Sequence, residues 1–220
     1  MSKRPLDIYT EPEDFDLDTL KNLGPLTALA GIWEGEGVDR HPVAEGGEDE
    51  PYLERMEFQP IDPQLNGPQL LYGLRYHVHV KKLTEPLTFH DQIGYWLWEP
   101  ATKVLLQTVA IPRGQVALAR GIAEPGAKSF TVRATLGAEC FGICSATFLQ
   151  KHFLTRSYTQ TLTFDSPRVL TYEQDTVLET PGRKPFHHTD RATLEKVGEP
   201  TPNPAAPKKV KGRTKRNVTV

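Results

Sequence analysis

The chain has 220 residues and a formal net charge of −2, with 38% hydrophobic and 25% charged residues. This balance is typical of a globular protein and excludes both a disordered chain and a membrane protein. The length suits one well-cored domain, because a single all-β barrel reaches this size. No apolar run matches a secretory signal or a membrane helix, so we expect a cytoplasmic protein without membrane insertion.

The two ends of the chain differ in composition from its middle. The acidic first residues lead into leucines at three-residue spacing, which predict a short helix that stops at Gly24. Residues 198–220 are rich in proline and carry six Lys and Arg residues against Glu199, a net of +5 that leaves −7 for the rest. We expect a disordered tail there and no nucleic-acid partner. The predicted organisation is an arm over 1–23, a barrel over 24–197 and this tail.

The middle of the chain has strand-like stretches separated by Gly, Pro, Asn or Asp. The segment 141–158 fits either a short helix or a strand with an insertion. A sheet of ten strands favours closure, since an open one leaves long unpaired edges. We therefore predict an all-β, antiparallel barrel of about ten strands, similar to lipocalins, with a short N-terminal helix. The predicted strands are Gly31–Val38, Tyr52–Gln59, Gln69–Val80, Leu87–Trp98, Val104–Ile111, Gln115–Ala123, Ser129–Leu136, Gln160–Phe164, Val169–Leu178 and His187–Leu194.

The first predicted strand contains the most distinctive motif, LAGIWEGEG, residues 29–37. Alternation along a strand places Gly31, Trp33, Gly35 and Gly37 on one face. Without side chains at the glycines, another backbone or a ring can come very close to this face. We expect this face to contact the ligand.

This motif resembles the G-x-W-x-G-x-G signature of the nitrobindin family, lipocalin-like barrels that bind haem b. Two further segments agree in order: HDQIGYWLW at 90–98 resembles an acidic-x-x-G-Y-W strand, and IPRG at 111–114 resembles an I-P-R-G turn. With the closing strand at 187–196, the resemblance covers about residues 24–197. It implies a small hydrophobic ligand held inside a barrel like those of fatty-acid-binding proteins, haem b as the candidate cofactor, and a homodimer as one assembly.

The last strand of the family opens with the histidine that binds the haem iron, in a pattern close to H-L-x-A-x-L-x-R/K. Ala192, Leu194 and Lys196 fit the later positions of this pattern. The resemblance then puts Thr189 at the position of the axial histidine. Threonine is not a usual ligand of haem iron, whereas neutral histidine is. The pattern therefore predicts weak haem binding or none.

Two histidines directly before Thr189 offer an alternative ligand. His187 and His188 point to opposite faces of a strand, so at most one of them faces inward together with Thr189. Simple alternation selects His187, with Arg191 on the same face as a partner for a ligand carboxylate. A bulge would bring His188 inward instead.

Other polar residues on the predicted strands are candidates to line the cavity. His77 and His79 share a strand face, and His90 follows in the next strand, so a zinc site is one option. A polar lining is the favoured interpretation, because a small barrel needs a few oriented polar groups. Tyr95 alternates with two tryptophans and is expected to edge the pocket.

Motifs of the common enzyme classes are absent from the sequence. There is no nucleophile elbow, phosphate loop, H-E-x-x-H helix or dinucleotide-binding motif. Cys140 and Cys144 are too few for a disulfide framework, and we expect them to be buried. The sequence therefore predicts binding or transport of a small hydrophobic ligand rather than catalysis. The alternative implied by the resemblance is a haem protein acting on nitric oxide, peroxynitrite or peroxide, such as a peroxynitrite isomerase.

Overall fold

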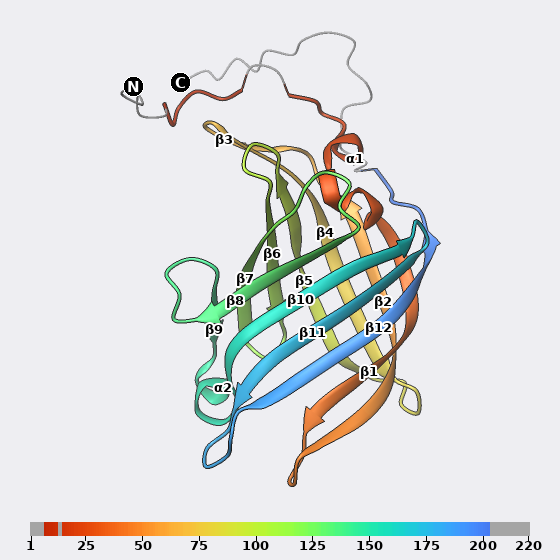
Figure 1. The fold of residues 1–220 in the computed structure, drawn as a ribbon, viewed down its shortest axis with the longest axis vertical. Coiled ribbons are helices and arrows are strands. Elements are labelled where there is room, and N and C mark those ends of the chain that lie inside the picture. Colours follow the sequence, from red (N-terminus) through yellow and green to blue (C-terminus); the bar gives the residue numbers. More distant parts are fainter. Residues whose placement is uncertain (1–6, 13–14, 203–220) are drawn as a thin grey trace.

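The body of the molecule is a barrel of mostly antiparallel strands with short helices at its two ends (Figure 1). The computed structural model describes residues 7–12 and 15–202. Its helices are α1 (Thr19–Asn22), the 3-10 helix η1 (Gly24–Ala28) and α2 (Thr147–His152). Its strands are β1 (Gly31–Pro42), β2 (Gly47–Pro60), β3 (Gln64–Asn66), β4 (Gln69–Lys82), β5 (Thr88–Glu99), β6 (Val104–Ile111), β7 (Gln115–Ile122), β8 (Ser129–Leu136), β9 (Gly142–Ser145), β10 (Leu154–Ser166), β11 (Val169–Glu179) and β12 (Phe186–Gly198).

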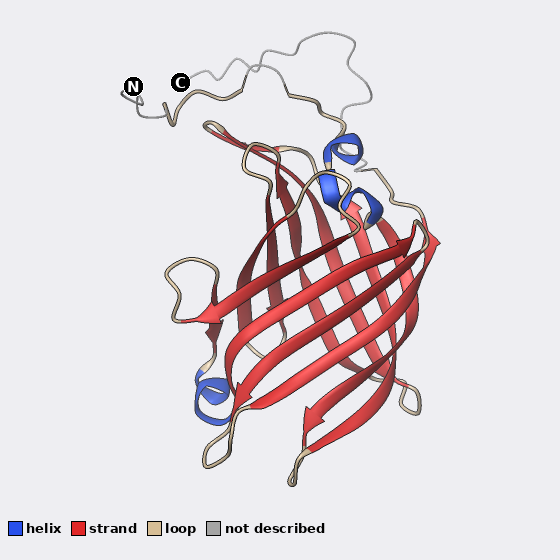
Figure 2. Ribbon diagram, viewed as in Figure 1, coloured by secondary structure: helices blue, strands red, loops and turns tan. Residues whose placement is uncertain are grey.

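The described strands form one 12-stranded sheet in the order β2-β1-β12-β11-β10-β8-β9-β7-β6-β5-β4-β3. Pairing of β2 with β4 closes the sheet, while β3 only extends the edge of β4. The closed wall therefore contains all of these strands except β3, which is one more than the ten expected. The predicted all-β barrel with a short N-terminal helix is confirmed (Figure 2).

Short elements account for the differences from the predicted strands. The ambiguous segment 141–158 contains β9, α2 and the first residues of β10. Elements as short as β3 and β9 carry too few residues for a periodic signal. Cys140 and Cys144, expected to be buried, are both exposed. Cys144 lies on β9, where it alternates with the buried Ile143 and Ser145 and so faces outward.

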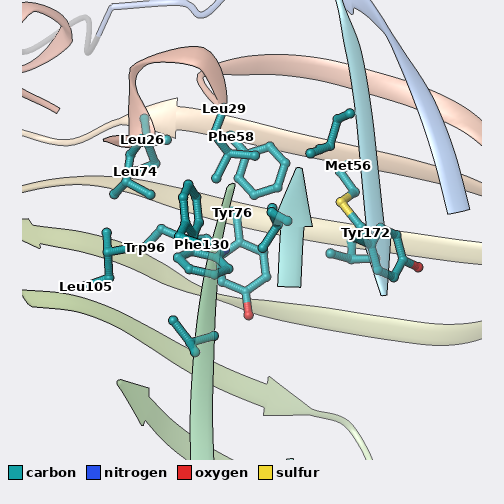
Figure 3. Close-up of a cluster of buried hydrophobic side chains, with 14 of the residues drawn as sticks. Leu26, Leu29, Met56, Phe58, Leu74, Tyr76, Trp96, Leu105, Phe130 and Tyr172 are labelled. Atoms are coloured by element: carbon teal, nitrogen blue, oxygen red, sulfur yellow. The ribbon is translucent and has the colours of Figure 1, made fainter. Parts of the chain in front are cut away.

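One end of the barrel is closed by α1 and η1, which we call the plug (residues 19–28). Leu26 and Leu29, within and directly after η1, are fully buried against the aromatic and aliphatic core inside the strands (Figure 3). Gly24 has φ +56°, and a Cβ there would lie 2.5 Å from the indole ring of Trp98. Glycine thus lets the chain turn from α1 into η1 directly against the core.

The glycine-tryptophan face of β1 points into the barrel, as predicted. Trp33 is fully buried. A Cβ at Gly35 would lie 2.2 Å from the backbone oxygen of Thr193 on β12, and one at Gly37 would lie 2.3 Å from the ring of Tyr52 on β2. The close approach of a backbone and of a ring that the motif predicts is therefore present.

Three expectations about the chain as a whole have different outcomes. Across residues 7–12 and 15–202, no helix has the length and apolar character to cross a membrane. Of the predicted tail at 198–220, Gly198 ends β12 and the backbone N–H of Thr201 donates to Gln59 at 2.6 Å. Beyond Pro202 the tail lies outside the described residues, so its disorder stays a prediction. The cytoplasmic location also stays a prediction.

Candidate functional site at the open end of the barrel

The interior of the barrel differs sharply between its two ends. Near the plug, inward-facing side chains such as Leu74, Leu105 and Leu170 are fully buried. At the other end, where the loops 43–46 and 180–185 lie (Figure 1), inward-facing apolar side chains such as Val109 and Ile111 are only partly buried, while Asp39 and Thr155 are buried. We call this second end the open end, because solvent reaches the inner face of the strands there.

Two kinds of side chain share the inner face at the open end. Val109 and Ile111 of β6, Ala117 of β7 and Leu178 of β11 form an apolar part and are all partly exposed. The inner face of β12, β1, β2 and β5 is instead polar. Partly exposed apolar residues next to oriented polar ones are typical of a small-molecule site.

The polar part centres on Asp39, His188 and Asp190, which we call the carboxylate–histidine cluster. Asp39 of β1 is 4% exposed and lies directly opposite Asp190 of β12. His188 precedes Asp190 on the same face of β12, and its Nε2 lies 2.5 Å from Oδ1 of Asp39. Gln174 of β11 donates to Oδ2 of Asp190 at 2.9 Å. Three neighbouring strands thus hold these side chains in place.

Burial and mutual proximity shift the ionisation of the cluster. Burial raises the pKa of Asp190 to about 6, with Asp39 adding to the rise while His188 and Gln174 oppose it. Burial works against the protonated form of His188, but its hydrogen bond to Asp39 and the nearby carboxylates outweigh that effect and raise its pKa. The imidazolium of His188 is thus stabilised by the carboxylates around it.

Further ionisable groups surround the cluster. Burial lowers the pKa of His90 on β5, which leaves this imidazole neutral near pH 7. Lys82 of β4 forms an ion pair with Glu50 of β2 at 3.3 Å. His41 places Nδ1 3.2 Å from Oδ2 of Asp39, yet this buried nitrogen has no hydrogen-bond partner in the described part of the chain.

A second acidic group lies deeper in the barrel. Glu54 of β2 is 4% exposed, and its Oε2 makes no hydrogen bond to any described residue. Burial raises the pKa of Glu54 to about 8, with Asp190 adding to the rise and Tyr172 opposing it. Beside it, the hydroxyl groups of Tyr52 and Tyr172 lie 2.7 Å apart. Glu54 is therefore mainly protonated near pH 7.

The structure reverses the predicted faces of the last strand. Ala192 and Leu194 are buried, and no register shift separates them from His188 along β12. His188 therefore faces inward. His187 and Thr189 lie on the outside, where Nδ1 of His187 pairs with Asp175 at 2.8 Å. His187 and Thr189 do share a strand face, as expected, but the prediction that this face points inward is wrong. His188 faces inward instead, and no bulge is needed to place it there.

Three other predicted site residues also lie on the outside of the barrel. His77, His79 and Tyr95 are on the outer face of β4 and β5, opposite in direction to His90, so the three histidines do not converge on zinc. His77 pairs with Asp91 instead, at 3.0 Å. The prediction that these side chains face inward was wrong. The inner face of each strand carries its buried residues, and these polar side chains alternate with them and face outward.

Shallow grooves run over this outer surface. One groove of about 520 Å³ crosses β10, β11, β12 and β1 and includes Thr189 and the exposed Arg191. Another of about 340 Å³ includes His77 and Tyr95. These predicted residues are therefore brought together in pairs, but away from the interior that contains Trp33 and the carboxylate–histidine cluster.

Comparison with known proteins places the chain in a family. The family model described as THAP4-like, heme-binding beta-barrel domain matches residues 22–196. The chain belongs to this family. The THAP4-like membership agrees with the nitrobindin resemblance of the motifs on β1 and β5. No curated protein gives a significant match.

Solved structures support the same fold. The crystal structure of Rv2717c from M. tuberculosis has a TM-score of 0.59 and 18% identity, over 83% of this chain and 99% of that one. At this identity the likeness shows the fold alone. The S-type phycobiliprotein lyase CPES from Guillardia theta, at a TM-score of 0.44 and 8% identity over 83% and 98% of the two chains, is too distant to carry an argument.

The haem implied by the THAP4-like family is a poor fit to the donor set of this chain. His188 is the inward imidazole of β12, but Asp39 holds its Nε2, and Asp39 and Asp190 offer carboxylate oxygens within 4.8 Å of its ligand atom. A porphyrin face on this imidazole would lie against two buried carboxylates. Burying such charges against an apolar ring is unfavourable. The residues present therefore do not fit haem b.

Proposed function

We propose that this member of the THAP4-like family binds a small amphipathic molecule in the open half of its barrel, for storage or transport. The observation that carries the proposal is the contrast along the interior. Inward-facing residues near the plug are fully buried, whereas the inward-facing Val109, Ile111 and Ala117 at the open end are partly exposed. A barrel wall with solvent access on one side is a suitable container for one small ligand.

The two parts of the open end suggest how such a ligand lies. Its apolar portion would contact Val109, Ile111 and Ala117, whose partly exposed side chains gain from being covered. Its polar end would face Asp39 and Asp190, which favour a cationic or hydrogen-bond-donating group. The proposal thus refines the predicted hydrophobic ligand to an amphipathic one with a positive or donating end.

A dansyl-labelled long-chain amine tests this proposal. Ala117→Phe fills the inner face of β7, whereas Leu118→Phe adds a similar ring to the outer face of the same strand. We expect Ala117→Phe to weaken binding by roughly tenfold or more, a loss of at least about 1.4 kcal/mol. Leu118→Phe should leave the affinity unchanged. Equal affinities of both variants and the wild type, with unchanged melting temperatures, would place the amine elsewhere.

For haem we infer weak, non-coordinating association. A haemin titration of the wild type should give only the broad absorbance of loosely held haemin, because Asp39 occupies the imidazole of His188. His187→Ala and His188→Ala should behave like the wild type. A sharp Soret band that is lost in His188→Ala but kept in His187→Ala would contradict this inference and would make His188 the axial ligand.

A further inference from the structure

Three side chains at the open end converge in the way that metal ligands do. Asp39, His188 and Asp190 each offer one ligand atom, and these atoms all lie within 4.8 Å of one another. The residues come from two paired strands with a regular register at this point. Their relative positions are therefore set by the sheet and not by a loop.

The two carboxylates of the cluster would be stabilised by a bound cation. Asp39 and Asp190 face each other directly across β1 and β12, an arrangement in which like charges are destabilising. His188 is the cation in contact with Asp39. Lys82, another cation on the inner face, pairs with Glu50 instead. Asp39 thus contacts the imidazoles of His188 and His41. Asp190 instead accepts a hydrogen bond from the neutral amide of Gln174.

A second imidazole lies beside Asp39. His41 lies on the same face of β1 as Asp39, with Nδ1 3.2 Å from Oδ2 of Asp39. This nitrogen is buried, and no described residue forms a hydrogen bond with it. Its close contact is the carboxylate of Asp39, and it is not among the three ligand atoms that converge.

We propose that Asp39, His188 and Asp190 bind one divalent transition-metal cation, with Zn²⁺ favoured over Mg²⁺ and Ca²⁺. Imidazole nitrogen and carboxylate oxygen are ordinary Zn²⁺ ligands, and three protein donors leave one position of a tetrahedral Zn²⁺ ion for water. Mg²⁺ and Ca²⁺ prefer more oxygen ligands and no imidazole. The site goes beyond the proposed small-molecule binding, since it needs no organic ligand.

Binding of the cation would replace a proton. Metal ligands bind in their deprotonated forms, so Zn²⁺ would displace the proton that His188 and Asp39 share. The carboxylate–histidine cluster would then change from a hydrogen-bonded network to a coordinated one. Stabilisation of the folded state by free Zn²⁺ follows by mass action.

The first experiment is a titration with Zn²⁺ by calorimetry and with Co²⁺ by visible absorbance. Both use the full chain carrying His77→Ala and His79→Ala. These two imidazoles share the outer face of β4 with ring centroids 6.3 Å apart, and their removal eliminates background binding there. We expect one equivalent of Zn²⁺ to bind and to raise the melting temperature. Absence of binding in this background would overturn the proposal.

Matched variants locate the site. His188→Ala and Asp190→Asn each remove a direct metal ligand. Each should weaken Zn²⁺ binding by at least the roughly 10–100-fold that is typical of losing a residue hydrogen-bonded to a ligand. His187→Ala, the adjacent imidazole on the outer face, should leave the affinity unchanged. An equal loss in His187→Ala and His188→Ala would place the metal elsewhere. His188→Gln replaces His188→Ala if the latter unfolds before the titration.

The metal-site proposal and the small-molecule proposal can be tested independently. Binding of the dansyl-labelled amine is measured in the presence of a chelator, which removes Zn²⁺ from the assay. Loss of the amine in Ala117→Phe with Zn²⁺ binding intact tests the small-molecule site alone. Loss of Zn²⁺ binding in His188→Ala, with binding of the dansyl-labelled amine intact in the presence of the chelator, tests the metal site alone.

Discussion

At the residue scale, Glu54 makes folding stability depend on pH. Its folded pKa of about 8 lies above the ordinary value of 4.5, so the folded chain binds more protons than the unfolded chain between these values. Stability should therefore fall as pH rises through this window. Glu54→Gln, which keeps the shape without the charge, should flatten the fall and melt at a higher temperature than the wild type near pH 8.

Thermal melts between about pH 5 and pH 8 measure this effect. Asp190, with a pKa of about 6, contributes in the same direction at the lower end of the range. Part of the slope above about pH 6 should thus disappear in Glu54→Gln. Glu57→Gln, a partly exposed residue on the outer face of the same strand, is the matched control. An unchanged slope in Glu54→Gln would mean that water reaches this carboxyl.

Some residues of the barrel interior could be predicted from the sequence and others could not. Trp33 and the glycines were found because their spacing is a visible motif. Asp39 and Asp190 were missed, although alternation from Trp33 and from Ala192 would have put both on inner faces. Their convergence depends on the pairing of β1 with β12, which joins opposite ends of the chain. No local pattern in the sequence specifies that pairing.

At the scale of elements, Trp33 ties β1 to the plug. Its Nε1 donates to the backbone oxygen of Leu29 at 2.8 Å, while its ring lies 6.3 Å from that of Phe164. Trp33→Ala removes both the core volume and this link, so we expect a loss of about 3–5 kcal/mol in the free energy of unfolding. Urea denaturation measures it. Glu36→Ala, exposed on the same strand, should change stability by less than about 0.5 kcal/mol.

Elements differ in how well their sequences predict them. The strands from Val104 to Ile111 and from Ser129 to Leu136 have the predicted bounds, because turn residues flank a clear alternation. The strand predicted at Gln160–Phe164 extends over Leu154–Ser166. Its extra residues include Arg156 and Ser157, which interrupt the apolar alternation. The register against β11 shifts here, because Thr155 and Ser157 pair with consecutive residues and Arg156 is skipped. Bulges of this kind shift the period and hide the strand from pattern reading.

At the scale of the whole molecule, closure was predictable and the orientation of polar residues was not. Ten alternating stretches leave few options other than a barrel, and the wall of this protein closes through β2 and β4. The faces of His77, His79 and Tyr95 were assigned without knowing which alternating set fills the core. Core packing decides that choice, since the set with Trp96 and Trp98 is the buried one.

The plug at residues 19–28 closes one end of the barrel and leaves the other end open. A ligand bound as proposed would enter and leave through the open end, past His188. The cation and the amphipathic molecule are both proposed to use Asp39 and Asp190, so whichever binds first would obstruct the other. The order in which the two are added would therefore change the rates of exchange while leaving the final equilibrium the same.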